Sequence, residues 1–190
     1  MFYVINGKKI IKTFKIVIFF ILIIVICKSM INYIFPIQYE EIIEKYAKKY
    51  NIEKELVFAV INAESRFDKN ATSNKGAIGL MQIMPDTGQW LSEKIKLDYF
   101  SEEMLYTPET NIQLGCYYLG YLLEKFEDET LALCAYNAGT TNVYRWLDND
   151  EYSLDGNIHT IPFKETDKYV KKIKVLKKGY IILFNTVHRK

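Results

Sequence analysis

An uncharged apolar run near the N-terminus is the feature that most constrains how this chain folds. Residues 16–27 carry no charge, and residues 30–35 beyond them are again mostly apolar. The run is apolar on every side, whereas a core helix of a globular domain has a polar face. Extended over residues 10–35, it is long enough to span a bilayer if Lys12, Lys15 and Lys28 reach the headgroups. We therefore predict one transmembrane helix rather than a buried core helix.

The residues that flank this run predict its orientation. Four lysines precede it, namely Lys8, Lys9, Lys12 and Lys15, which predicts a cytoplasmic N-terminus. No small-x-small cleavage pattern follows, so an uncleaved signal anchor is expected rather than a cleaved signal peptide. Cys27 follows Val25 and Ile26, not the small residues of a lipobox, so no lipoprotein is expected.

Two parts are predicted from this pattern. Residues 1–35 form a cytoplasmic basic tip and a transmembrane signal anchor. Residues 36–190 form one globular domain on the extracytoplasmic side of a cell membrane, which the chain crosses once. The first part holds five of the 25 basic residues and none of the 23 acidic ones, so the second holds 20 basic and 23 acidic residues and has a net charge near −3. This acidic balance argues against a nucleic-acid partner.

Histidines and cysteines indicate no metal site. His159 and His188 stand far apart without ligand spacing, so neither a metal nor another cofactor is expected. Cys116 and Cys134 lie in apolar helical patterns and are expected to be buried free thiols. A bridge between them in an oxidising compartment stays open as the alternative.

Apolar residues of the predicted domain recur at helical spacing, and no stretch alternates as a half-buried strand does. The predicted helices cover residues 38–50, 51–65, 86–95, 108–126, 128–137, 140–147 and 165–184. Thr107 followed by Pro108 is a strong helix start. Residues 68–75 and 148–161 are predicted loops. The expected fold class is all-α, with at most a minor β element.

Glu64 lies on the apolar face of its predicted helix. Val57, Val60 and Ile61 precede it at the spacing of one helical face. Burial disfavours a charged carboxylate, and the outward carbonyls at the end of the helix do the same. Both effects raise the pKa and favour a protonated general acid near neutral pH. The ordinary alternative is a glutamate paired with a nearby lysine or arginine on a partly exposed face.

Four short motifs accompany this glutamate in a fixed order. They are AESRF at 63–67, GAIGLMQIMP at 76–85, AYNAG at 135–139, and IPFKET at 161–166 followed by Tyr169 and Val170. Together they resemble the soluble (SLT-type) lytic transglycosylases of the goose-type-lysozyme-like family, over roughly residues 40–185. The resemblance implies a lysozyme-like, mainly helical fold. It also implies one catalytic glutamate, Glu64, that cuts the glycan strands of peptidoglycan.

The same resemblance implies which residues bind the substrate. Ser73 would contact the sugar that is cleaved, and Gln82 and Met84 would line the cleft beside the acid. Gln82 can donate and accept hydrogen bonds, which suits hydroxyl and acetamido groups. By itself, this segment is also consistent with a glycine turn that leads into a helix, with its apolar residues in the core.

Three further residues enter the site through the resemblance. Tyr136 and Asn137 end an apolar helix, where helix capping alone explains an Asn before Ala-Gly. The resemblance places both in the site, where a tyrosine hydroxyl can orient the carboxyl group. Glu165 opens the last helix, where an acid is favoured by the helix dipole alone. The resemblance places it in the cleft region.

A second acid near Glu64 is missing from the motif, and Asp68 lies in an unmatched turn. Ordinary glycosidases use two carboxyl groups. The resemblance implies that Glu64 protonates the leaving oxygen and then takes the proton of the muramic C6 hydroxyl, which leaves a 1,6-anhydro-MurNAc end. The alternatives are a goose-type lysozyme-like muramidase, which hydrolyses the same bond, and a non-catalytic peptidoglycan-binding scaffold subunit.

Overall fold

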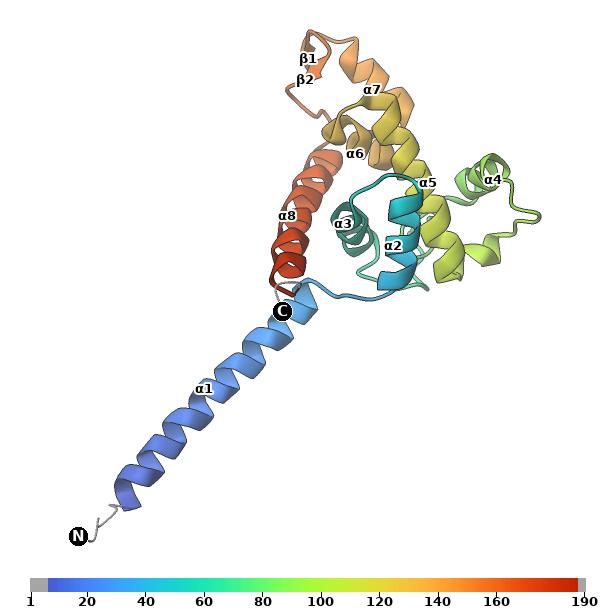
Figure 1. The fold of residues 1–190 in the computed structure, drawn as a ribbon. Coiled ribbons are helices and arrows are strands. Elements are labelled where there is room, and N and C mark those ends of the chain that lie inside the picture. The colour runs from blue at the N-terminus through green and yellow to red at the C-terminus, as the bar shows by residue number, and fades with distance from the viewer. Residues whose placement is uncertain (1–6, 188–190) are drawn as a thin grey trace. The chain divides into compact units, whose positions relative to one another are not determined.

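The computed structural model describes residues 7–187, and its contacts divide the chain between Pro36 and Ile37. The first six residues of the predicted cytoplasmic tip lie outside this range, as does His188. The first unit contains one helix, α1 (Gly7–Ile34) (Figure 1). Its segment Phe14–Ile34 has a mean hydropathy of 2.7. By length and composition, this helix can cross a membrane.

The second unit is mainly helical, as predicted. Its helices are α2 (Glu40–Lys49), α3 (Lys54–Glu64), α4 (Pro85–Lys94), α5 (Pro108–Phe126), α6 (Glu129–Ala138), α7 (Thr140–Leu147) and α8 (Lys164–Val187). A 3₁₀ helix, η1 (Glu102–Tyr106), precedes α5. The strands β1 (Ser153–Leu154) and β2 (Asn157–Ile158) pair antiparallel, with Ser153 opposite Ile158. This hairpin is the minor β element that the sequence allowed.

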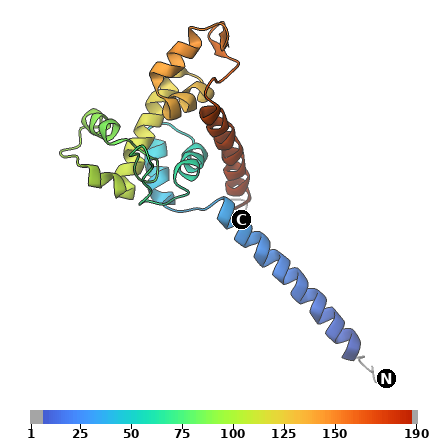
Figure 2. The same cartoon turned by 180° about the vertical axis from the view of Figure 1, so that it is seen from behind.

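Helix α3 is enclosed by its neighbours. It packs against α2 and most extensively along α8, while α5 packs against α2, α4 and α6 (Figure 1). The view from behind shows α8 again running alongside α3 (Figure 2). Seven consecutive residues of α3, 56–62, are buried, because helices cover it on more than one side. Glu64 is the last residue of this buried helix.

Element boundaries depart from the prediction where the backbone turns sharply. The helix expected to begin at residue 51 begins at Lys54 instead, because Asn51 adopts a left-handed conformation with φ 54°. The elements η1, β1 and β2 are five residues or fewer, which is too short to give a hydrophobic period.

Both cysteines of the domain are buried free thiols, the first of the two alternatives drawn from the sequence. Burial raises the pKa of Cys116 and raises that of Cys134 to about 12. Both thiols therefore stay protonated and unreactive near neutral pH.

Candidate active site

A cleft of about 460 Å³ brings together the seven site residues that the sequence selected. It is lined by Glu64, Ser73, Asn74, Lys75, Ala77, Gln82, Met84, Tyr136, Asn137 and Glu165. These residues come from the end of α3, the loop before α4, the end of α6 and the start of α8. The chain therefore assembles the cleft from four separate segments.

Glu64 is half-buried, and α8 holds the end of its helix in place. The Tyr169 hydroxyl donates a hydrogen bond of 2.6 Å to Glu64 Oε1. One turn later, Lys172 Nζ donates a hydrogen bond of 2.8 Å to the backbone oxygen of Ala63. This carbonyl belongs to the last turn of α3, where helical carbonyls lack partners within the helix. Helix α8 thus fixes both the carboxyl group and the helix end that carries it.

The pKa of Glu64 is raised to about 7, which is the net result of one effect that raises it and two that lower it. Burial is the largest and raises the pKa, because the charged form loses hydration. The hydrogen bond from Tyr169 and the charge of Lys172 both lower it. Near neutral pH, Glu64 therefore exchanges readily between the acid and the carboxylate, so it can donate a proton and later accept one.

Two tyrosines near Glu64 have different roles. The sequence suggested that the hydroxyl of Tyr136 can orient the carboxyl group, but it donates instead to the Met81 backbone oxygen at 2.8 Å. The hydroxyl that contacts Glu64 is that of Tyr169. Burial, and then the charge of Glu64, raise the pKa of both tyrosines well above the usual value. Both remain protonated hydrogen-bond donors.

The opposite side of the cleft is a loop held by backbone hydrogen bonds. Ile78 forms isolated bridges with Thr72 and with Ile83, and Gly79 N donates to Ala71 O at 2.8 Å. Ser65, next to Glu64, donates its hydroxyl to the Leu80 backbone oxygen at 2.8 Å, which links the end of α3 to this loop.

Asn111, a fully buried residue of α5, holds the loop in place through three hydrogen bonds. Its Nδ2 donates to the backbone oxygens of Ile78 at 2.9 Å and Leu105 at 2.8 Å, and its Oδ1 accepts from Met81 N at 2.8 Å. Gly79 lies against it with φ 79°, and a Cβ there would lie 2.3 Å from Leu105 O and 2.4 Å from Asn111 Nδ2. Only glycine fits this position.

Two predicted sugar-binding residues of the loop have part of their hydrogen-bonding capacity already in use. Ser73 Oγ accepts from Ala77 N at 2.9 Å, which leaves its hydroxyl proton available to a ligand. Gln82 Nε2 donates to the backbone oxygens of Gly79 at 2.9 Å and Ala71 at 3.2 Å. Its amide group therefore offers the cleft chiefly an acceptor, its carbonyl oxygen, rather than the donor and acceptor that the sequence suggested.

The remaining predicted residues lie on the side of α6 and at the rim. Asn137 Oδ1 accepts from the buried Thr166 hydroxyl at 2.8 Å, so its NH₂ group stays available as a donor. Met84 is 41% exposed and immediately precedes α4. The Glu165 side chain is 78% exposed, and its Oε2 lies 4.0 Å from Lys75 Nζ. Glu165 is thus a rim residue rather than a buried partner of Glu64.

The sequence did not predict the contribution of three residues that shape the site, which are Asn111, Tyr169 and Lys172. Tyr169 belongs to the last of the four motifs but was given no role, and Lys172 was not selected at all. Their contacts depend on α3 packing along α8, which the structure alone shows. Asn111 could have been found, because it is a polar residue on one helical face with Leu114 and Gly115, three and four residues on. Asp68 lies outside the cleft lining and accepts a hydrogen bond from Asn70 N. Within residues 7–187, no cluster of side chains suited to a metal ion occurs.

The fold and this cleft together define a lysozyme-like helical domain with a half-buried glutamate at the end of a helix. Residues 41–158 match the Transglycosylase SLT domain family, and the chain belongs to this family. The lysozyme-like fold expected from the sequence is thereby confirmed. The chain resembles the crystal structure of an inactive glutamate-to-glutamine mutant of the Pseudomonas aeruginosa lytic transglycosylase Slt, with a TM-score of 0.73 and 35% identity over 80% of this chain.

Proteins with a similar sequence are likewise named lytic murein transglycosylases. The chain is 36% identical to the soluble lytic murein transglycosylase of Salmonella typhimurium over 143 residues, which are 73% of this chain. It is 28% identical over 167 residues to the membrane-bound lytic murein transglycosylase C of Actinobacillus pleuropneumoniae. The matches span 22% and 46% of those proteins, and 25% of the Pseudomonas chain.

Proposed function

We propose that this protein is a membrane-anchored peptidoglycan lytic transglycosylase, which cleaves the MurNAc–GlcNAc β-1,4 bond and leaves 1,6-anhydro-MurNAc ends. The observation that carries the proposal is the single half-buried Glu64, with a pKa of about 7 and a hydroxyl donor at 2.6 Å, in a cleft whose lining carries hydrogen-bonding side chains. Membership of the SLT family supports the same substrate class.

In the proposed reaction, Glu64 acts twice. Protonated Glu64 first donates its proton to the glycosidic oxygen, and the bond from this oxygen to the muramic C1 breaks. The N-acetyl group of the substrate shields the positive charge at C1. The Glu64 carboxylate then takes the proton of the C6 hydroxyl, whose oxygen bonds to C1. The enzyme regains its proton and no water is consumed. A pKa near 7 suits both steps, because neither form is strongly disfavoured.

Roles for the cleft residues follow from the hydrogen-bonding groups that they leave available. Ser73 would donate its hydroxyl proton and Asn137 its amide protons to sugar oxygens. Gln82 would accept from a hydroxyl or acetamido N–H.

Met84 would pack against the apolar face of a sugar ring, and Glu165 would contact the substrate at the rim. Tyr136 would position the loop through Met81.

Hydrolysis of the same bond is the second candidate, because Glu165 is another acid in the cleft lining. Its high exposure favours a peripheral role over activation of a water molecule. The test is to digest purified cell wall with the full chain and to treat the released muropeptides with borohydride. Anhydro ends resist reduction and are one water lighter than muramidase products. Reducible ends would instead support a muramidase.

A non-catalytic scaffold subunit is distinguished by activity itself. Purified protein should clear a suspension of cell walls, and the Glu64→Gln variant should bind walls without clearing them. Wall binding without clearing by both proteins would favour the scaffold.

Anchoring by α1 is the other part of the proposal. Support comes from the apolar segment Phe14–Ile34 and from a relative that is named membrane-bound. We propose a single span, with residues 36–190 on the extracytoplasmic side and the first 35 residues serving as tip and anchor. The protein should then fractionate with membranes and keep Met1. Protease added to intact, wall-stripped cells should digest the domain, and a protected soluble protein would contradict the proposal.

A further inference from the structure

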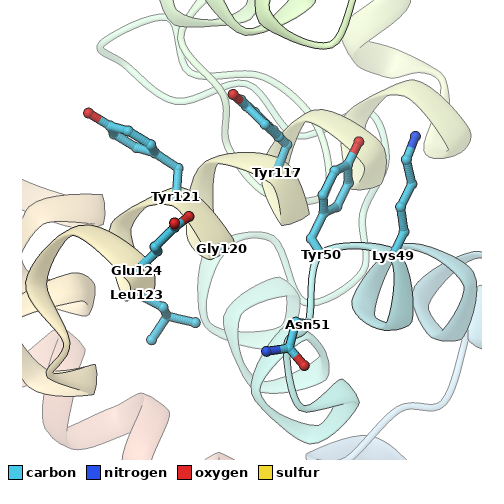
Figure 3. Close-up of a pocket in the computed structure, with 8 residues that line it drawn as sticks. All are labelled: Lys49, Tyr50, Asn51, Tyr117, Gly120, Tyr121, Leu123 and Glu124. Carbon is cyan, nitrogen blue, oxygen red and sulfur yellow. The ribbon is translucent and has the colours of Figure 1, made fainter.

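A second cavity, of about 660 Å³, lies where the end of α2 meets α5 (Figure 3). It shares no lining residue with the catalytic cleft. Its lining consists of Lys49, Tyr50, Asn51, Tyr117, Gly120, Tyr121, Leu123 and Glu124.

The cavity is shaped by a close approach of two helices. At Gly120, a Cβ atom would lie 3.1 Å from the Tyr50 backbone oxygen and 3.4 Å from the Tyr50 Cβ atom. The absence of a side chain at Gly120 lets α5 pass close to the end of α2. Tyr117 and Tyr121 lie one turn apart on α5 and therefore on one face of that helix.

Three tyrosines give this cavity an aromatic wall. The rings of Tyr50 and Tyr117 meet edge to face, with centroids 5.5 Å apart. In Figure 3, the side chains of Tyr50, Tyr117 and Tyr121 extend from the ribbon toward the same side of the view. A tyrosine combines an apolar ring face with a polar hydroxyl, and a sugar ring likewise combines an apolar C–H face with hydroxyl groups.

Polar groups around these rings add both hydrogen-bond donors and hydrogen-bond acceptors. Lys49 contributes an ammonium group, Asn51 an amide and Glu124 a carboxylate. The Tyr50 hydroxyl is buried and has no hydrogen-bond partner within the protein. An unpaired buried hydroxyl is costly, and such groups are rare in folded proteins. Because this hydroxyl is enclosed, a ligand would hydrogen-bond first to the exposed polar groups of Lys49, Asn51 and Glu124.

A chain of aromatic contacts connects this cavity to the catalytic cleft. The Tyr121 ring lies 5.9 Å from Trp90, and Trp90 lies 6.2 Å from Tyr118. The Tyr118 ring lies 5.3 Å from Tyr136, which lines the cleft. The aromatic contacts therefore run without a break from the lining of one cavity to the lining of the other.

We propose that the cavity between α2 and α5 is a second glycan-binding site, which holds a strand of N-acetylated amino sugars while the cleft cuts. This inference rests on the proposed function, because it takes the wall glycan as the ligand. One cation and one anion in the lining favour a ligand of low net charge over an anionic polymer. Such a site would keep the enzyme on an insoluble polymer between cuts.

The test uses the full chain in detergent, with Glu64→Gln in every protein so that the ligand survives. Binding is measured by sedimentation with purified insoluble peptidoglycan and by titration with an oligomer of N-acetylglucosamine. Replacing both Tyr117 and Tyr121 by Ala should weaken wall binding by about tenfold, which corresponds to about 1.4 kcal/mol. Tyr121→Phe, which keeps the ring, should bind normally. Tyr99→Ala removes a 70% exposed tyrosine outside both cavities and should also bind normally.

Variants with Glu64 intact separate this inference from the proposed function. The double alanine variant should cleave short soluble muropeptides at the normal rate and clear insoluble walls more slowly. Normal wall binding by this variant, with its circular dichroism unchanged, would overturn the second site alone. So would competition by a wall stem peptide that carries no sugar. If the double variant does not fold, Tyr121→Leu and Glu124→Ala singly decide the matter by the same sedimentation. An absence of any wall cleavage by the wild type would refute the proposed function instead.

Discussion

The two walls of the catalytic cleft are built in different ways. Glu64 stands on a wall of packed helices, in which α8 covers α3 and Tyr169 reaches the carboxyl group. Ser73 and Gln82 stand on an irregular loop that is held by backbone hydrogen bonds and by the buried amide of Asn111. The first wall sets the proton affinity of Glu64, whereas the second sets which hydrogen-bonding groups line the cleft. The walls should therefore fail differently when they are altered.

The largest expected effect is on the helical wall, at the acid itself. Glu64→Gln keeps the shape of the side chain but removes the proton, and general acid catalysis is worth about 10²–10⁴-fold. We expect at least this loss in the release of muropeptides, with unchanged circular dichroism. Glu151→Gln is the control, because Glu151 is exposed and lies outside the cleft lining, and it should retain the activity. A fully active, folded Glu64→Gln variant would refute the role of this residue.

Stability should change in the opposite direction to activity in the same variant. The pKa of Glu64 is raised in the folded protein, from 4.5 to about 7. The burial penalty is therefore absent below pH 4.5, develops as the pH rises toward 7, and is complete above it. Above pH 7, Glu64→Gln should be more stable than the wild type by about 3 kcal/mol at most. Urea unfolding at pH 4 and pH 8 measures the difference, and a variant less stable at pH 8 would contradict the account.

Adding one methyl group at Gly79 should disrupt the loop wall of the cleft. Gly79→Ala places a Cβ atom against Leu105 O and Asn111, so we expect destabilisation by about 2–5 kcal/mol and loss of cleavage. Gly76→Ala is the matched control, since Gly76 also has a positive φ, 87°, but no atom within 4 Å of the added Cβ. It should cost about 1–2 kcal/mol. Equal losses from both substitutions would show that steric contact does not fix this loop.

Tyr169→Phe should sharpen the comparison, because it removes only the hydroxyl. The hydrogen bond lowers the pKa of Glu64, so its loss should raise that pKa further and move the basic limb of the pH–rate profile to higher pH. Near pH 6, the rate should fall by about tenfold, since a positioning hydrogen bond of about 1.4 kcal/mol is lost. Tyr136→Phe, which disturbs the loop through Met81, should lower the rate without this shift. Identical profiles for the two variants would contradict the separate roles.

The smallest effect is expected at Lys172. Its charge lowers the pKa of Glu64 less than the tyrosine does, so Lys172→Gln should move the basic limb in the same direction by a smaller amount. Lys171→Gln is the adjacent control, because Lys171 pairs with Asp167 at 2.7 Å. A shift in the control as large as that of Lys172→Gln would show a general charge effect.

The helical wall was more accessible to sequence reasoning than the loop wall. The spacing of Val57, Val60, Ile61 and Glu64 predicts both the helix and the buried acid, because both depend on a local period. Tyr169 was not assigned a role, because its contact with Glu64 joins residues 105 positions apart. The loop could be placed only by its resemblance to a family. Its geometry depends on Asn111 and on the left-handed Gln82, φ 49°, and neither produces a periodic signal.

The central claim is that Glu64 regains its proton from the C6 hydroxyl of the substrate and not from a water molecule. The most direct measurement is digestion of purified peptidoglycan by the full chain in ¹⁸O-water, followed by mass spectrometry of the released muropeptides. The account predicts 1,6-anhydro-MurNAc ends without ¹⁸O. Incorporation of ¹⁸O at the muramic C1 would show that water is the acceptor, and the protein would then be a muramidase on the same fold.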